Sequence, residues 1–200
     1  MNQEQVWDAI SESWSNFKQR IFEKEVYNLN WKKGKLLDIG CGNCRNLLPF
    51  KEMELYGIDF SSGMLEQARK YIKKYNLKVN LKKSNMIKLP FNDGFFDYCL
   101  FLNSLHHVNK GDADKSLKEL YRVLKKNGQC LISVWNEYGL LSLFKKVERD
   151  IPWHKKDKTY YRYYYFYNYF EFRRLLLKNN FRIIKSGKIF DKNIKFLIQK

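Results

Sequence analysis

The stretch LLDIGCGNCR, residues 36–45, decides the fold that this chain is expected to adopt. A short apolar run leads into Asp38, and a turn built on Gly40 and Gly42 follows at once. Glycine lets the backbone turn tightly at the end of a strand. A second apolar run ends in Asp59, 19 positions after Gly40. In βαβ nucleotide folds, the acidic residue that contacts the ribose follows the glycine turn by ~20 positions. These features predict a site for an adenosine-containing cofactor.

Strand-like and helix-like patterns alternate along most of the chain. Strands are expected at 35–39, 55–59, 77–83, within 93–105, and at 129–135, 182–187 and 194–199. Helices are expected from Asn43, at 61–75, at 112–128 with Gly128 as its end, and at 171–181. This order is typical of an α/β fold, here a Rossmann-like, doubly wound, mostly parallel sheet of seven strands.

The flanks of the alternating region differ from it in composition. One or two amphipathic helices over residues 6–31 predict an N-terminal helical cap of about residues 1–30. Residues 137–167 read as an irregular insertion that is basic and aromatic. We expect a single domain that spans residues 1–200.

The charge of the chain points to an anionic partner. Lys and Arg number 38 against 21 for Asp and Glu, which gives a formal net charge of +17. This favours nucleic acid as a partner, and a compositional bias toward lysine is the alternative. No apolar run approaches the ~20 residues of a membrane span. The polar, acidic N-terminus lacks a signal-peptide pattern, so we expect a cytoplasmic protein without a membrane partner.

Four long segments together resemble the class I S-adenosylmethionine-dependent methyltransferases. They are LLDIGCGN, GIDFSSGMLEQAR, SNMIKLPFNDGFFDYCLFLNSLHHV and ELYRVLKKNGQCLISVW, and the resemblance covers roughly residues 30–136. It implies S-adenosylmethionine as the cofactor. The positions that it implies for cofactor binding are Asp38, Gly40, Gly42, Asn43, Asp59, Phe60, Asn85, Met86 and Leu102.

The resemblance also implies a role for several of these residues. The glycines would border the methionine part of the cofactor, with Asp38 near its ammonium group. Asp59 would contact the ribose hydroxyls, and Asn85 and Met86 would lie beside the adenine. A dinucleotide site is the main alternative, but Arg45 stands where its third glycine is needed for a pyrophosphate. An acidic residue before the turn suits a cationic cofactor better than it suits the pyrophosphate of a dinucleotide.

Two residues depart from the methyltransferase pattern. Cys44 replaces the third glycine of the turn, where we expect it to crowd the cofactor, and Asn85 replaces the usual acid before the adenine contact. Cys41 and Cys44 also form a C-x-x-C pair, which is sometimes redox active or zinc binding. Since Cys41 is the variable residue of the turn and no second cysteine pair exists, we expect no metal site.

The flanks resemble the wobble-uridine tRNA methyltransferases. The matching residues are Ile151-Pro152-Trp153, Arg162-Tyr163-Tyr164, the C-terminal segment through Asn193, and AISESWSNFKQR near the N-terminus. That family methylates the carboxylate of a 5-carboxymethyl group on the wobble uridine of tRNA. It also works with a small zinc-containing activator protein, which covers a sheet edge that residues 77–83 would supply here.

In that family an arginine, an acid and a histidine act at the site, and they fall on Lys18, Asp59 and His106. Lysine at position 18 lacks the bidentate recognition of carboxylate that arginine provides, and Arg20 is the alternative. His106 is either a substrate contact or a structural ring beside His107. No strong base is needed, because a carboxylate is already ionised at neutral pH. The residues expected to contact substrate or RNA are Arg20, Arg45, Arg162, Tyr163 and Tyr164.

Tyrosine occupies seven of the ten positions 160–169. Exposed rings would serve as stacking platforms for unpaired bases, with Arg162 and nearby lysines on phosphates. Packing of the rings against the sheet is the alternative. Two other functions stay open: a small-molecule methyltransferase of the quinone-precursor type, and a cofactor-binding RNA module without catalysis.

Overall fold

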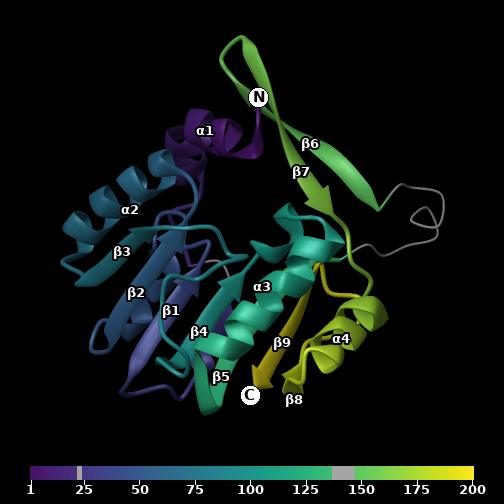
Figure 1. Ribbon diagram of the computed structural model, residues 1–200. Helices are drawn as coiled ribbons and strands as arrows, with labels where there is room; N and C mark the ends of the chain where they lie inside the picture. Colours follow the sequence, from purple (N-terminus) through teal and green to yellow (C-terminus); the bar gives the residue numbers. More distant parts are fainter. Residues whose placement is uncertain (22–23, 137–146) are drawn as a thin grey trace.

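The computed structural model describes residues 1–21, 24–136 and 147–200. Its centre is a seven-stranded sheet in the order β3-β2-β1-β4-β5-β9-β8 (Figure 1). The strands are β1 (Lys35–Ile39), β2 (Glu54–Asp59), β3 (Val79–Lys83), β4 (Phe96–Leu102), β5 (Leu124–Trp135), β8 (Arg182–Ser186) and β9 (Asn193–Gln199). Strands β1 to β5 pair in parallel, whereas β9 runs antiparallel to both β5 and β8. The predicted mostly parallel α/β sheet is confirmed.

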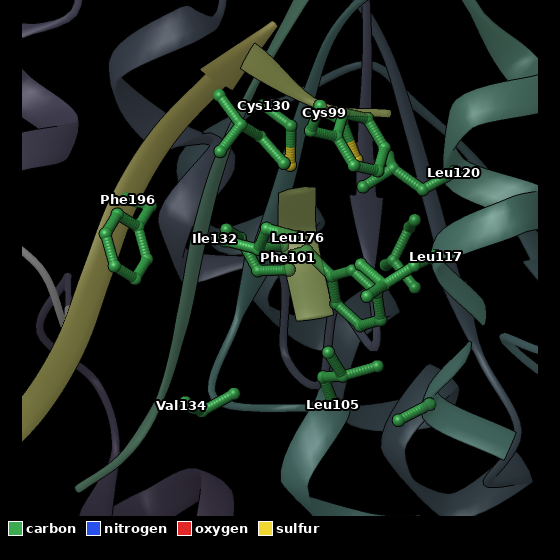
Figure 2. Packing of buried hydrophobic residues seen from close by; sticks show 14 of the residues in the cluster. Cys99, Phe101, Leu105, Leu117, Leu120, Cys130, Ile132, Val134, Leu176 and Phe196 are labelled. Carbon is green, nitrogen blue, oxygen red and sulfur yellow. The ribbon is translucent and has the colours of Figure 1, made fainter. Parts of the chain in front are cut away.

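Side chains of the central strands alternate between two cores, one on each face of the sheet. In β4, Cys99 and Phe101 join the cluster under α3 (Lys110–Val123) and α4 (Tyr169–Lys178), both in front of the sheet in Figure 1. Figure 2 shows part of this cluster, including Phe101, Leu117, Leu176 and Phe196. Leu100 and Leu102 face the second cluster, which contains residues of α2 (Ser62–Tyr75). This two-residue period explains why β4 reads as apolar throughout.

Helix α1 (Gln3–Phe17) is fixed over the carboxyl ends of the strands by its contacts with α2. Asn2 and Gln5 form a capping box at its first turn. The Asp8 carboxylate accepts hydrogen bonds from Ser61 Oγ at 2.6 Å and from the Gly63 N–H at 2.9 Å. The rest of the expected helical cap is a short 3-10 helix, η1 (Lys24–Asn28).

Two helix predictions are wrong in their extent. The helix expected from Asn43 is only a 3-10 helix, η2 (Arg45–Phe50), and it contains Pro49. The helix expected to end at Gly128 already ends at Val123. Leu124 is fully buried and pairs with Phe96, so the sheet takes up a residue that the local pattern assigned to the helix.

The segment expected to be irregular contains a regular β-hairpin. Strands β6 (Glu148–Lys155) and β7 (Lys158–Tyr165) form a separate antiparallel sheet, which projects beside α1 in Figure 1. Lys156 turns the chain with a positive φ of 52°. Residues 137–146 of the predicted insertion lie outside the described residues. Among the described helices, none has the length and apolar character to cross a bilayer.

Candidate active site

A cavity of about 830 Å³ opens at the carboxyl ends of the parallel strands. Its floor comes from the segments after β1, β2, β3 and β4, and its walls come from α1, the 3-10 helix η3 (Leu105–His107) and the hairpin. This is where open α/β sheets bind ligands. The predicted site residues that line it are Lys18, Gly40, Gly42, Arg45, Asp59, Phe60, Asn85, Met86, Leu102, His106, Arg162, Tyr163 and Tyr164.

The glycine turn has the backbone geometry that the sequence motif predicts. Gly40 and Gly42 have φ values of 67° and 54°. A Cβ at Gly40 would lie 2.5 Å from Ser104 Oγ, so a side chain does not fit there. Cys44 also adopts a left-handed φ of 63°, as the missing glycine would. Its side chain is buried in the second core cluster and does not line the cavity, so the expected crowding of the cofactor is wrong.

Asp59 is held at the end of β2 by backbone donors. Its Oδ2 accepts the N–H of Gly42 and its Oδ1 accepts the N–H of Ser61, both at 3.0 Å. Burial raises the pKa of Asp59 to about 6, although these backbone N–H groups act in the opposite direction. Each carboxylate oxygen can accept a second hydrogen bond, so the side chain is suited to bind ribose hydroxyls.

Asp38 lies beneath the turn and does not line the cavity directly. It is 2% exposed, and its Oδ2 has no hydrogen-bond partner among the described residues. Burial raises its pKa to about 8, which Asp59 reinforces and Arg45 opposes. An unpaired buried carboxyl oxygen beside a second acid fits a ligand that carries positive charge. The residues around the turn therefore fit S-adenosylmethionine, which is cationic and has no phosphate.

Two of the predicted site residues, Asn43 and Arg20, do not line the cavity. The side-chain amide of Asn43 donates to Ser15 Oγ at 3.1 Å and to the Lys18 carbonyl at 2.8 Å, so it fastens the end of α1 to the turn. Arg20 is exposed and does not line the cavity. The structure therefore does not support Asn43 as a direct cofactor contact or Arg20 as the substitute for arginine at position 18.

The two histidines of η3 are neutral, and His106 is buried whereas His107 is half-buried. The backbone N–H of Trp135 donates to His106 Nδ1 at 3.3 Å, so the proton of the neutral imidazole ring is on Nε2. His107 Nδ1 lies 3.0 Å from the Tyr163 carbonyl, which can only accept, so this nitrogen carries the proton. Burial lowers the pKa of His106 well below its usual range and that of His107 to about 4. His106 is therefore suited to donate a hydrogen bond rather than to act as a cation.

Arg162 and Tyr164 are buried in the wall of the cavity and do not form an exposed surface for RNA. Arg162 is 6% exposed, and its guanidinium lies 5.0 Å from the Trp153 ring and 5.8 Å from the Trp7 ring. Tyr164 is 2% exposed and stacks on His106 with ring centroids 5.0 Å apart. Because these side chains are part of the cavity wall, any contact that they make with substrate or RNA is with a group inside the cavity, and not with phosphates on the outer surface.

Three of the seven tyrosines at positions 160–169 pack inside the protein. Tyr164, Tyr165 and Tyr167 are buried, whereas Tyr161 is 56% exposed. Tyr165 also donates to Glu171 at 2.7 Å. Strand β7 and α4 place the rings between the hairpin and the main core, where packing excludes water. The packing alternative for this cluster is therefore confirmed for the buried rings.

The cavity contains residues that the sequence analysis missed. Trp7, Trp14 and Trp153 give it an aromatic wall, and Lys192 adds a cation from the loop before β9. Burial lowers the pKa of Lys18, with Arg45, Lys192 and Arg162 as further causes, so these four cations share one region. Trp7 and Trp14 had a signal in their helical spacing, but it also fits an ordinary core helix, whereas Trp153 lies on β6.

The C-x-x-C pair is enclosed beside the turn. Both thiols are buried, and a hydrogen bond from Cys44 is the main cause that raises the pKa of Cys41 well above its usual value. Reactive cysteines need the opposite shift. Among the described residues, no group of three or more His, Cys, Asp and Glu side chains is placed to hold a metal ion.

Comparison with known proteins gives the same class as the site. A family model for a methyltransferase domain matches residues 36–128. The chain is 30% identical over 150 residues to probable tRNA methyltransferase 9B of Bos taurus, covering 74% of this chain and 30% of that protein. It is 35% identical over 116 residues to demethylmenaquinone methyltransferase of Geobacillus, covering 54% of this chain and 49% of that protein. The chain thus spans half or less of the length of these two relatives.

Solved structures share the fold. An S-adenosylmethionine-dependent methyltransferase from Methanosarcina mazei matches with a TM-score of 0.75 at 19% identity, covering 90% of this chain and 98% of that one. A chain in the complex between the Haloferax volcanii Trm112 methyltransferase activator and the putative methyltransferase matches with a TM-score of 0.72 at 13% identity, covering 99% and 96%.

The sheet order, the glycine turn tied to Asp59 and the matched domain define the class of this protein. The chain contains a methyltransferase domain, matched over residues 36–128, with the class I S-adenosylmethionine-dependent fold, and S-adenosylmethionine is its cofactor. Within that class it resembles the tRNA methyltransferase 9 family.

Proposed function

We propose that this chain methylates the carboxylate of 5-carboxymethyluridine at the wobble position of tRNA, forming a methyl ester. The observation that carries the proposal is the combination of groups that line the cavity. The glycine turn and Asp59 share it with three tryptophans and the cations Lys18, Arg45, Arg162 and Lys192. Aromatic rings suit a flat base, and the cations suit a carboxylate.

The residues at the carboxyl ends of β1, β2 and β3 would hold the cofactor. Asp59 accepts hydrogen bonds from ribose hydroxyls, and Asn85 and Met86 border the adenine. Gly40 and Gly42 leave room for the methionine part, with Asp38 as the buried acid near its ammonium group. When bound, the cofactor supplies an electrophilic methyl group on a sulfonium centre.

The cations of the cavity and His106 would position the substrate. A carboxylate is already ionised at neutral pH, so no side chain has to remove a proton. Lys18 attracts the anion, and the neutral His106 ring donates its Nε2–H to a carboxylate oxygen. Asp59 would act only through the position of the cofactor. The protein's contribution is mainly orientation and exclusion of water, since α1 and the hairpin cover the cavity.

A partner protein is part of the proposal. Strand β3 is an edge of the main sheet, as expected for the surface that an activator covers. The structural neighbour from Haloferax volcanii comes from a complex with such an activator. We infer that a small zinc-containing protein of this type binds the β3 edge and that the zinc belongs to the partner.

Nucleoside analysis tests this function. Bulk tRNA that contains 5-carboxymethyluridine is incubated with the chain and S-adenosylmethionine, with and without a Trm112-type activator, then digested and examined by mass spectrometry. We expect a new methyl ester of the modified uridine. If no methyl ester forms in either reaction, the proposed substrate is wrong.

A small quinone precursor is the second candidate substrate. It is supported by the 35% identity to demethylmenaquinone methyltransferase and by the aromatic wall of the cavity. Methyl transfer to demethylmenaquinone, in the absence of transfer to tRNA, would favour it. If neither tRNA nor demethylmenaquinone is methylated, the remaining candidate function is that of a cofactor-binding RNA module without catalysis.

A further inference from the structure

The least explained charge in the described structure is the guanidinium of Arg162. It is 6% exposed, and no carboxylate among the described residues forms an ion pair with it. A buried charge without a counter-ion costs several kcal/mol, so proteins retain one mainly where a ligand neutralises it. Arg162 lines the cavity, so a ligand there is the available source of negative charge.

The hydrogen bonds of Arg162 leave donors unused. Its Nη1 donates to the Tyr164 hydroxyl at 3.0 Å and its Nη2 donates to the Pro152 carbonyl at 3.4 Å. Nε is buried and has no hydrogen-bond partner in the part of the chain that the structure describes. A guanidinium has five N–H donors, so the group retains capacity for an acceptor.

A second buried donor lies beside Arg162. Trp7 is 7% exposed, and its indole N–H has no partner among the described residues. The Trp7 ring lies 5.8 Å from the Arg162 guanidinium, and both residues line the cavity. The Tyr164 hydroxyl accepts from Arg162, so its own hydrogen is also available. The corner formed by Trp7, Arg162 and Tyr164 therefore presents donors and positive charge, which is the chemistry of an anion site.

We propose that this corner binds the carboxylate of the substrate and that Arg162 determines specificity for an anionic over a neutral group. The inference deepens the proposed function by naming the residue that supplies the guanidinium missing at position 18. Arg162 comes from the hairpin rather than from the N-terminal segment, and it lies close enough to Lys18, His106 and His107 to lower their pKa values.

The test compares two probes that differ only in charge. The full chain, saturated with S-adenosylhomocysteine, is titrated with 5-carboxymethyluridine or with the neutral 5-carbamoylmethyluridine, and binding is followed by tryptophan fluorescence. We expect the wild-type protein to prefer the carboxylate by about tenfold or more. Arg162→Met should bring the ratio of the two affinities close to one, whereas Arg162→Lys should restore part of it.

Arg149→Lys is the matched control. Arg149 lies on the same hairpin and over the Phe166 ring, but it does not line the cavity, so the ratio should stay at the wild-type value. Unchanged affinity for S-adenosylhomocysteine shows that each variant is folded. Trp7→Phe, which removes the indole N–H and keeps a ring, should reduce the preference as well.

The outcomes separate the inference from the proposed function. A wild-type protein without preference for the carboxylate overturns the inference, and so does an Arg162→Met variant that retains the preference. If the preference depends on Arg162 but tRNA is not methylated, the carboxylate site stands and the proposed substrate is wrong. If tRNA is methylated equally well by Arg162→Met, the function stands without this residue.

Discussion

The backbone N–H of Gly42 donates a hydrogen bond of 3.0 Å to Oδ2 of Asp59. The turn after β1 is thereby tied to the acid at the end of β2, and the two parts of the cofactor motif form one rigid unit. Since the Ser61 N–H holds the other oxygen, the carboxylate cannot rotate without losing a bond. This bond explains why the glycine turn and Asp59 already have their relative positions before a ligand binds.

Asp59→Asn should weaken cofactor binding. The amide replaces one acceptor oxygen by a donor that would face a backbone N–H, so the bond to Gly42 or to Ser61 is lost. We expect the affinity for S-adenosylhomocysteine, measured by calorimetry, to fall by about tenfold or more. Asp93→Asn is the control, because that side chain is 81% exposed and forms an ion pair with Arg122 at the surface. Equal affinities of Asp59→Asn and wild type would contradict the role of Asp59.

Asp38→Asn should change how stability depends on pH. The pKa of Asp38 is about 8 in the folded protein, above its ordinary value of 3.8, so the folded state keeps a proton that the unfolded chain releases. This contribution to stability is complete at low pH and is lost as the pH rises from about 4 to 8. The asparagine variant carries no such proton, so it should gain stability relative to wild type over this range.

The measurement for Asp38 is the difference in melting temperature between the two proteins at several pH values. Other titrating groups, such as His107 with its pKa of about 4, contribute to both proteins and largely cancel in the difference. We expect the difference to grow in favour of Asp38→Asn from pH 5 to pH 8. A constant difference would show that Asp38 ionises normally in the folded state.

Asp8→Ala should loosen α1 from the cavity. It removes the acceptor for Ser61 Oγ and for the Gly63 N–H, which join α1 to the start of α2. We expect a loss of about 1–3 kcal/mol in the free energy of unfolding, and faster hydrogen exchange in α1 than in α3. Glu12→Ala, an exposed position of the same helix, should leave both unchanged. Uniform exchange rates in the Asp8 variant would mean that the contact does not hold α1.

Lys156 and Lys158 at the hairpin turn should contribute to tRNA binding through charge alone. Both are exposed and lie outside the cavity lining. Replacing both by glutamine should weaken tRNA binding at low salt and reduce the slope of log K against log salt by roughly 1 per lost phosphate contact. Affinity for S-adenosylhomocysteine should not change. An unaltered slope would place the RNA on another face.

The sequence predicted the elements whose identity depends on neighbours along the chain. The strand expected at 35–39 has the bounds Lys35–Ile39, and the helix expected at 61–75 begins one residue later, at Ser62. The end of α3 was wrong because Leu124 is held by Phe96, which is distant in sequence. The hairpin was missed for the same reason, since Trp153 packs against Phe17 of α1 and Tyr164 packs against His107 of η3.

The sequence by itself determined the cofactor class, because the order of strand, glycine turn and acid is local and fixes which groups meet at the strand ends. Only the tertiary structure decided the direction of Arg162 and the tyrosines. A basic and aromatic run reads as an exposed RNA surface when taken alone. Its burial depends on Trp7 and His106, which come from α1 and η3, and contacts between such distant segments leave no pattern in a single sequence.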